Sequence, residues 1–418
     1  MNNKINGVLP RCNFVSALML LIFIGNSHLL AWYCDYINPA EIYLLSKSDK
    51  YNYLLKYLNV HLEFLNNSLD LSQFIDNFIK DSEWDSLQKA SIFNKIPRPF
   101  FSLNGNGIIT PIAFSTQLFT ISAQYNEQIV VDIPKDLLDL IFWGNNLNRR
   151  YDIANFDFSR LSYYNFSLGV NYPIIKNIME EAILNNFNLG IKFHWLIGRY
   201  ITQTDSAFGL VLTTPNVLIG EMQIFQRTAK GGNCLAVDIG TQTQFLQSFT
   251  LGLAMLNINH GFVWTSEPKY RILSITIDSL SLQRYIEYGS IDSVYHKFDS
   301  IKPQSAFKTN SPAQILLQAS YQPNRLLVLK TGYHQYLSKN RFTDNFYRSM
   351  NYGVHFNFIK YFASEVSFTT DLKHNFAIGT EFYIIIKGAR FKLLISQLNG
   401  CFQKAKGICF DLSFGQNW

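Results

Sequence analysis

The chain has 418 residues and a formal net charge of +6, with 15% aromatic and only 16% charged residues. Soluble globular proteins are about 25% charged, so this composition argues against an ordinary soluble protein and suits a barrel whose lipid-facing band needs little charge. The basic residues are spread along the chain rather than gathered in runs, which argues against a nucleic-acid-binding function.

Residues 1–31 have the organisation of a signal peptide. Basic residues precede an almost uncharged apolar core, Phe14–Gly25, and the small residue Ala31 stands at a plausible cleavage point. The apolar core is shorter than the roughly 20 residues that a membrane-spanning helix needs. Lipid attachment at Cys34 is an alternative, but the bulky Tyr33 in front of it disfavours this. We therefore expect export, and any residence in a membrane must come from strands.

Two helical segments interrupt the first third of the mature chain. After a predicted strand at Tyr57–Asn67, the segment at about 69–96 has apolar residues spaced three and four apart, which predicts an amphipathic helix. The segment at about 134–146 begins with Pro134 and predicts a second short helix. A barrel wall consists of strands, so we expect both segments to form a plug or a periplasmic cap. Between them, Asn104–Gly107 has the composition of a hairpin turn.

Strands dominate from Leu161 onward. Apolar residues alternate with polar or small ones over Leu189–Ile197, which places Lys192 and His194 on the polar, lumen-facing side. Turns are predicted at Thr214–Asn216 and at Lys230–Asn233. The polar interval Ser274–Thr309 is expected to be an outer loop or a small capping element.

The last seventy residues carry the strongest signal. From Arg348 to Trp418 four runs alternate between aromatic or aliphatic residues and small or polar ones. This pattern predicts an all-β protein, a transmembrane antiparallel β-barrel with a short helical insert near its N-terminal third. The chain ends on an aromatic residue in an alternating strand, which resembles the closing strand of bacterial outer-membrane barrels. We therefore assign Phe414 and Trp418 as an insertion signal. A secreted β-sandwich is the alternative fold.

Several short motifs resemble a family of Bacteroidetes-type outer-membrane barrels, the domain of unknown function 5723. They are Val237–Gly240 with Leu251–Gly261, where an Asp-x-Gly strand pairs with a strand that ends in Asn and Gly, then Gly261–Trp264, and the element Ile133–Asn145 before the main barrel. Fatty-acid-transporter-like barrels and type IX secretion barrels share the first pattern. The resemblance implies an outer-membrane barrel of about 14 strands over residues 32–418 and no settled substrate.

No catalytic constellation is found in the sequence. The eight His residues are scattered without metal-ligand spacing, and no Gly-x-Ser-x-Gly motif is present. We therefore expect no enzyme activity, no cofactor and no metal site, and we predict that Cys401 and Cys409 do not form a disulfide. A polar residue on the inner face of a strand is a candidate for lining the lumen. These candidates are Lys192, His194, His334, His355, Glu365 and Glu381.

The sequence leaves three functions open. The first is a passive channel in the cell outer membrane for small or hydrophobic molecules, and the second is a scaffold barrel that docks a periplasmic or secretion-machinery partner. The third is a soluble secreted binding protein. The expected partners of the barrel are outer-membrane lipid and, during insertion, the barrel-assembly machinery.

Overall fold

The computed structural model places most of the mature chain. The predicted signal peptide at residues 1–31 lies outside the described residues. These are residues 38–40, 53–74, 85–116, 118–144, 146–175, 184–215, 217–246, 248–280, 295–342, 347–359, 361–371, 375–386 and 389–417.

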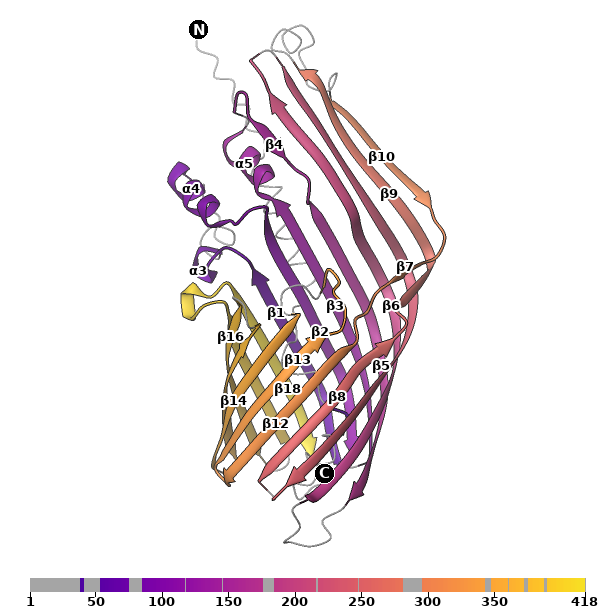
Figure 1. The fold of residues 1–418 in the computed structure, drawn as a ribbon, viewed down its shortest axis with the longest axis vertical. Helices are drawn as coiled ribbons and strands as arrows, with labels where there is room; N and C mark the ends of the chain where they lie inside the picture. The colour runs from indigo at the N-terminus through magenta and orange to yellow at the C-terminus, as the bar shows by residue number, and fades with distance from the viewer. Residues whose placement is uncertain are drawn as a thin grey trace.

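Fourteen antiparallel strands form a closed ring, because the last strand pairs with the first (Figure 1). The predicted transmembrane-type β-barrel fold of about 14 strands is thus confirmed. In order around the ring the strands are β1 (Tyr53–Asn66), β2 (Phe100–Thr116), β3 (Phe119–Pro134), β5 (Asp157–Ile175), β6 (Leu184–Thr213), β7 (Leu218–Phe245), β8 (Phe249–Asn259), β12 (Gln314–Asn324), β13 (Leu327–Tyr336), β14 (Arg348–Ile359), β15 (Phe362–Thr370), β16 (Phe376–Ile386), β17 (Ala389–Leu398) and β18 (Gly407–Asn417).

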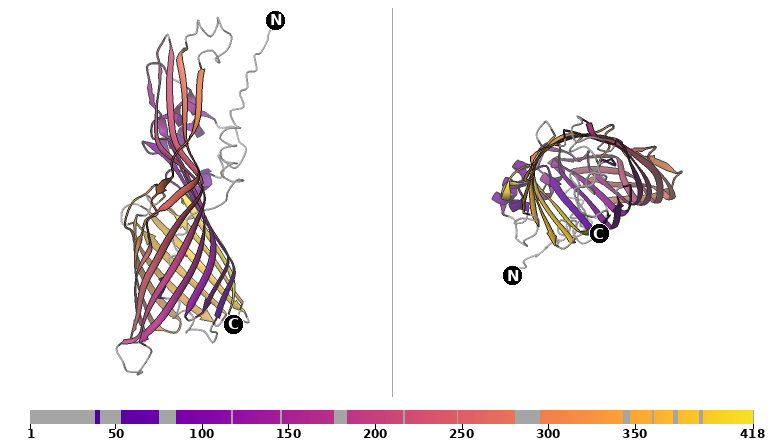
Figure 2. Two further views of the ribbon diagram at one scale, coloured as in Figure 1. Left: turned by 90° about the vertical axis from the view of Figure 1, so that its right-hand side faces the viewer. Right: turned by 90° about the horizontal axis from the view of Figure 1, so that it is seen from below.

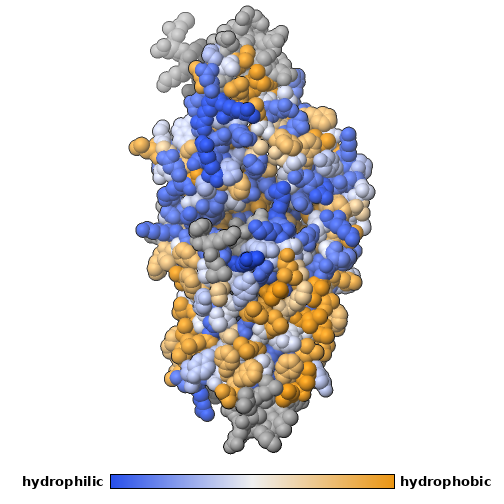
Figure 3. Space-filling model, viewed as in Figure 1, coloured by the Kyte–Doolittle hydropathy of each residue, from blue (hydrophilic) through white to orange (hydrophobic). Residues whose placement is uncertain are grey.

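The two faces of the wall differ in polarity because successive strand residues point to opposite sides. In β6, Phe193 and Trp195 are 55% and 53% exposed on the outside. His194 between them is largely buried on the inside. Figure 3 shows the outer residues as a hydrophobic band over the lower part of the molecule, below a more hydrophilic upper part. A band of this kind is what a barrel presents to lipid.

A narrower sheet extends from one end of the barrel (Figure 2). Strands β6 and β7 have 30 and 28 residues, against the roughly 9–11 that cross a bilayer. Residues 236–245 of β7 pair with β8 as part of the barrel wall. Residues 218–233 of β7 pair instead with β9 (Phe262–Leu280), in the extension. The extension is completed by β10 (Tyr295–Pro303) on β9 and by β4 (Arg150–Asp152) on β6. A short strand, β11 (Phe307–Thr309), also pairs with β9.

Two turn predictions are wrong because the strands continue through them. Lys230–Asn233 lies within β7, where the pairing with β9 shifts between Thr228 and Lys230 and Gly231 has a φ of +69°. The glycines therefore serve a β-bulge rather than a turn. Asn104–Gly107 lies within β2, and Asn104 and Asn106 are buried. The polar interval Ser274–Thr309 is predicted as an outer loop or a small capping element. Most of its described residues form the end of β9 and all of β10 and β11, so they are strands of the extension and not a loop. In the predicted turn at Thr214–Asn216, Thr214 and Pro215 do lie between β6 and β7, and Asn216 lies outside the described residues.

The helices lie at the same end of the barrel as the extension (Figure 1). Within the first predicted segment are α3 (Leu71–Phe74) and α4 (Ser86–Lys95), and α4 begins with a capping box between Asp85 and Gln88. The second segment forms α5 (Lys135–Trp143), which ends at Gly144 with a φ of +76°. A single turn of 3-10 helix, η4 (Phe402–Lys404), connects β17 to β18. No described helix is both long enough and apolar enough to cross a membrane.

The corner where the extension leaves the barrel has its own hydrophobic core. Trp264 in β9 is fully buried, and its indole Nε1 donates a hydrogen bond to Thr309 Oγ1 at 2.8 Å. The ring lies over Gly198 and Gly232, where a Cβ atom would come within 2.6 and 2.8 Å of it. Phe262 stacks on Trp264 at 5.5 Å between ring centroids. The two glycines thus allow the indole to pack directly on the backbone of β6 and β7.

A closed ring predicts heat-modifiable mobility on SDS gels. Every wall strand is hydrogen-bonded on both sides, so the folded barrel has no edge at which detergent-induced unfolding can begin. We expect unheated protein from the membrane fraction to migrate differently from boiled protein. Identical mobility of the two samples would contradict the closed ring.

Candidate functional site

The segment Asn38–Ala40 lies inside the barrel against the strands β5 to β8. The side-chain amide of Asn38 donates hydrogen bonds to the carbonyl oxygens of Thr241, at 2.9 Å, and Leu253, at 3.5 Å. On the other side, Asn171 Nδ2 donates to the carbonyl oxygen of Ala40 at 3.1 Å. Asn38 and Ala40 are fully buried. The segment is therefore held by the wall of the lumen although it belongs to the N-terminal part of the chain.

The wall has small residues on its inner face where Asn38–Ala40 packs against it. Asn171, Gly190, Gly240 and Ala254 are direct partners across four neighbouring strands, and three of the four are small. A Cβ atom on Gly190 would overlap the backbone of Pro39, and one on Gly240 would overlap the side-chain amide of Asn38. These glycines form a seat that larger residues would fill, and we call this row of four residues with Asn38–Ala40 the lumen seat.

Sequence reasoning did not find the lumen seat. In the sequence, Asn38–Ala40 carries no recognisable motif, and Gly240 stands out only as the end of the Asp-x-Gly pattern in Val237–Gly240. Nothing in the spacing of residues 38–40 and 240 indicates that they touch. The signal that was available is the row of glycines on the inner face of adjacent strands, since glycine in a strand often marks a close approach by another backbone.

Lys192 and His194 lie on the inner face of β6, next to the lumen seat. Lys192 is the direct partner of Asp238 across β6 and β7, and His194 Nε2 lies 2.7 Å from Asp238 Oδ2. The other carboxylate oxygen of Asp238 accepts a hydrogen bond from the backbone N–H of Asn257 at 2.6 Å. Asp238 thereby connects three strands, and the pairing expected between the Asp-x-Gly strand and the strand ending in Asn is present.

We expect replacement of Asp238 by alanine to lower the free energy of unfolding by about 1–3 kcal/mol. The substitution leaves the half-buried N–H of Asn257 without its acceptor, and an unsatisfied donor removed from water has a cost of this size. Urea unfolding in lipid vesicles would measure it. Glu221→Ala is the matched control, because Glu221 is exposed on the extension and should change stability by only about 0.5 kcal/mol. Equal effects of the two variants would contradict the role assigned to Asp238.

The opposite half of the lumen contains buried ion pairs. Glu365 is 2% exposed and lies 2.7 Å from Lys330 Nζ and 3.3 Å from His355 Nδ1. Glu381 is the direct partner of Glu365 across β15 and β16 and pairs with Lys392. The lumen here is polar, and each of these carboxylates has a cation beside it.

The remaining predicted residues lie at separate places. His334 is buried and its Nε2 is 2.9 Å from Gln314 Oε1. Phe414 is 46% exposed on the outer face of β18, next to Tyr57. Trp418 lies outside the described residues. That the six polar residues line a conducting path, and that Phe414 and Trp418 signal insertion, stay predictions.

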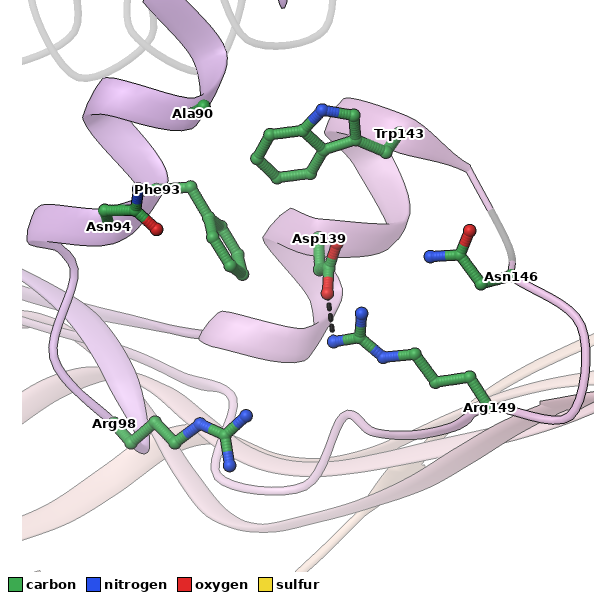
Figure 4. Close-up of a pocket in the computed structure, with 8 residues that line it drawn as sticks. All are labelled: Ala90, Phe93, Asn94, Arg98, Asp139, Trp143, Asn146 and Arg149. Carbon is green, nitrogen blue, oxygen red and sulfur yellow. Dashed lines mark ion pairs between the residues drawn. The ribbon is translucent and has the colours of Figure 1, made fainter. Parts of the chain in front are cut away.

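An open pocket of about 570 Å³ lies between α4 and α5 (Figure 4). Phe93 of α4 and Trp143 of α5 meet edge to face in it, with 4.9 Å between ring centroids. On the other side Arg149 pairs with Asp139. The pocket combines an aromatic surface with polar groups.

Two cations near this pocket, Lys135 and Arg98, have different surroundings. Partial burial lowers the pKa of Lys135 below its ordinary value, and the charge of Arg98 lowers it further. Lys135 Nζ lies 4.6 Å from the centre of the Phe93 ring. Arg98 is exposed, and no carboxylate among the described residues forms an ion pair with it. Arg98 is thus a cation that an anionic group in the pocket could approach.

The comparison with known families gives a match to the N-terminal part of the barrel, less than half of the chain. A family model matches from the start of β1 to the bulge in β7. Residues 50–231 are a match to the family of unknown function DUF5723. The resemblance stated from the short motifs is thereby confirmed, and it rests on a different part of the chain from most of those motifs. No curated protein matches the sequence significantly.

Solved structures share the fold at low sequence identity. A structure described as a mutant (deltaS2) of the monoaromatic hydrocarbon channel TodX has 11% identity and a TM-score of 0.51, over 91% of this chain and 93% of that one. A FadL homologue from Pseudomonas aeruginosa has 8% identity and a TM-score of 0.46, over 91% and 93%. The toluene transporter TodX from Pseudomonas putida has 11% identity and a TM-score of 0.46, over 94% and 96%. At these identities the likeness concerns the fold alone.

Proposed function

We propose that this barrel is an outer-membrane channel for small amphipathic or hydrophobic molecules, and that the lumen seat closes it. The observation that carries the proposal is the row of small residues that receives Asn38–Ala40. A wall with nothing packed against it has no need of glycines there, because glycine weakens a strand. A wall that receives a segment of backbone in the lumen does need them.

The hydrogen bonds at the lumen seat suit a reversible closure. Among the described residues, three hydrogen bonds hold Asn38 and Ala40 to the wall, and one of them is long at 3.5 Å. A hydrogen bond contributes about 0.5–1.5 kcal/mol net. The polar part of this closure is therefore weak enough for thermal exchange between closed and open states.

The pocket between α4 and α5 supports a small amphipathic cargo. Phe93 and Trp143 offer an aromatic surface, and Arg98 and Arg149 offer guanidinium groups beside it. Channel-type structures of the same fold are described as passing monoaromatic hydrocarbons, which supports the apolar half of this proposal. The predicted absence of enzyme activity is in keeping with a channel and stays a prediction.

Uptake by whole cells tests the channel function. We expect cells that produce the protein to take up a radiolabelled small aromatic alcohol and a small aromatic carboxylate faster than cells that do not. Phe93→Ala with Trp143→Ala should slow both, and Arg98→Ala should slow only the carboxylate. Leu118→Ala is the control, because Leu118 is exposed in the turn at the opposite end of the barrel. Uptake equal to that of cells without the protein would overturn the proposal.

Docking of a protein partner is a second candidate function, favoured by one face of the extension. Phe208, Gln223, Ser274 and Phe298 are direct partners across β6, β7, β9 and β10, so they share a face. Phe208 and Phe298 in this row are 59% and 58% exposed. Exposed aromatic residues are enriched at interfaces. Co-purification of a partner that is lost on Phe208→Ser with Phe298→Ser, together with unchanged uptake, would favour docking over transport.

A further inference from the structure

Four side chains with metal-ligating chemistry meet where the barrel closes. His61 and Glu63 are two residues apart in β1 and so point to the same face, as Cys409 and Asp411 do in β18. The two strands pair so that His61 is opposite Asp411 and Glu63 is opposite Cys409. None of the four is more than 4% exposed. The closing pair of strands thus creates a buried cluster from the two ends of the chain.

The ligand atoms in this cluster are close enough for one ion. A ring nitrogen of His61, a carboxylate oxygen of Glu63 and Cys409 Sγ all lie within 4.8 Å of one another. Cys409 Sγ is 3.8 Å from His61 Nε2. A tetrahedral zinc ion with ordinary Zn–S and Zn–N bond lengths holds these two atoms about 3.6 Å apart. Only a small adjustment of the side chains would bring them to bonding distance.

The carboxylate of Glu63 points independently to a bound cation. Glu63 is 1% exposed, and neither of its oxygen atoms has a hydrogen-bond partner. An ionised carboxylate buried in this way is costly unless it is paired or binds a metal. The carboxylates Glu365 and Glu381 in the same lumen each have a cation beside them, so Glu63 departs from the pattern of its neighbours.

Asp411 is placed to orient the histidine. Asp411 Oδ2 lies 3.4 Å from His61 Nδ1, while Nε2 faces Cys409. Metal-binding histidines usually donate their second ring N–H to a carboxylate or a carbonyl, which fixes the tautomer and the ring orientation. This arrangement directs Nε2 toward Cys409, the second ligand of the proposed site.

We propose that His61 Nε2, Glu63 and Cys409 Sγ bind one Zn²⁺ ion inside the barrel, with Asp411 as the positioning residue for His61. A set of one nitrogen, one oxygen and one sulfur ligand suits zinc better than calcium or magnesium, which take oxygen ligands. The ion would join the first and last strands. No sequence motif marks this site, because its ligands come from the two ends of the chain.

Metal titration of the refolded full-length mature protein tests the site. The protein is refolded in detergent with and without Co²⁺, which replaces zinc and gives a thiolate-to-cobalt absorption band. We expect one Co²⁺ per chain with this band, and one zinc per chain by elemental analysis after refolding with Zn²⁺. Cys409→Ser should abolish the band. Asp411→Asn should weaken binding about 10–100-fold, as loss of such a carboxylate does elsewhere.

The controls separate loss of a ligand from loss of the fold. Cys234→Ser removes another buried cysteine of the barrel and should keep the band. Glu63→Gln removes a buried charge without changing the size of the side chain, so it should fold and yet bind Co²⁺ at least about tenfold more weakly. No stoichiometric metal in the refolded protein, or an unchanged band in Cys409→Ser, would overturn the proposal. So would unchanged affinity in a folded Glu63→Gln variant.

Discussion

Replacement of Gly240 by valine is expected to hold the channel open. The side chain would occupy the position of the Asn38 amide in the lumen seat, so Asn38–Ala40 could no longer rest against β7. Two well-formed hydrogen bonds, from Asn38 to Thr241 and from Asn171 to Ala40, would be lost with it. At about 1 kcal/mol each, these bonds favour the closed state by roughly 30-fold. The ratio of open to closed channels should therefore rise by about that factor.

Conductance in planar lipid bilayers measures this change. The valine substitution should not harm the wall, because valine favours strands more than glycine does. Gly332→Val is the matched control, since a Cβ atom at Gly332 meets only the carbonyl oxygen of Leu317, at 3.4 Å. Asn38→Ala should give an intermediate increase. If Gly240→Val folds, as judged by gel mobility, and conducts like the original protein, the lumen seat does not close the channel.

Replacement of Trp264 by alanine is expected to lower the free energy of unfolding by about 3–5 kcal/mol. Large buried aromatic residues have this cost when truncated, because apolar surface is lost and a cavity is left behind. Here the cavity would open between Gly198 and Gly232, whose missing side chains leave nothing to fill it. The hydrogen bond to Thr309 is lost as well. Urea unfolding in lipid vesicles gives the magnitude.

A second tryptophan provides the control for this experiment. Trp195 lies in β6 on the outer face and is 53% exposed, so its truncation leaves no buried cavity. We expect Trp195→Ala to cost less than half as much as Trp264→Ala. A comparable loss in both variants would show that the corner between barrel and extension does not depend on packing of the indole.

The arrangement of the connections indicates which side of the membrane carries the extension. The wall has an even number of strands, so the start of β1 and the end of β18 lie at one end. At that end several strands are joined by short turns, such as Asn324 to Leu327, whereas the helices and the extension lie at the other end. Bacterial barrels have short periplasmic turns and longer outer loops. By this rule we expect the helices and the extension to face the outside, and labelling of an exposed cysteine introduced in the extension of whole cells would test this orientation.

Much of the wall was predictable because its signal is local. Alternation in β14, β15, β16 and β18 follows from lipid on one side and a polar lumen on the other, and both act on each strand separately. The helix α5 was predicted for the same reason, since Pro134 and Gly144 mark its ends within a few residues. The length of β6 and β7 was not predictable from turn residues, because Gly231 and Gly232 look alike in a turn and in a bulge.

The sequence by itself determined the alternation of many strands and, with it, that His194, Glu365 and Glu381 lie on the polar side; it favoured a barrel but left a β-sandwich as the alternative. These properties depend on the alternation of neighbouring residues and need no knowledge of the distant chain. Only the tertiary structure decided that Asn38 meets Gly240, and that His61 and Glu63 meet Cys409. Contacts between residues so far apart depend on the number of strands and on the register in which the ring closes, and no local pattern encodes either.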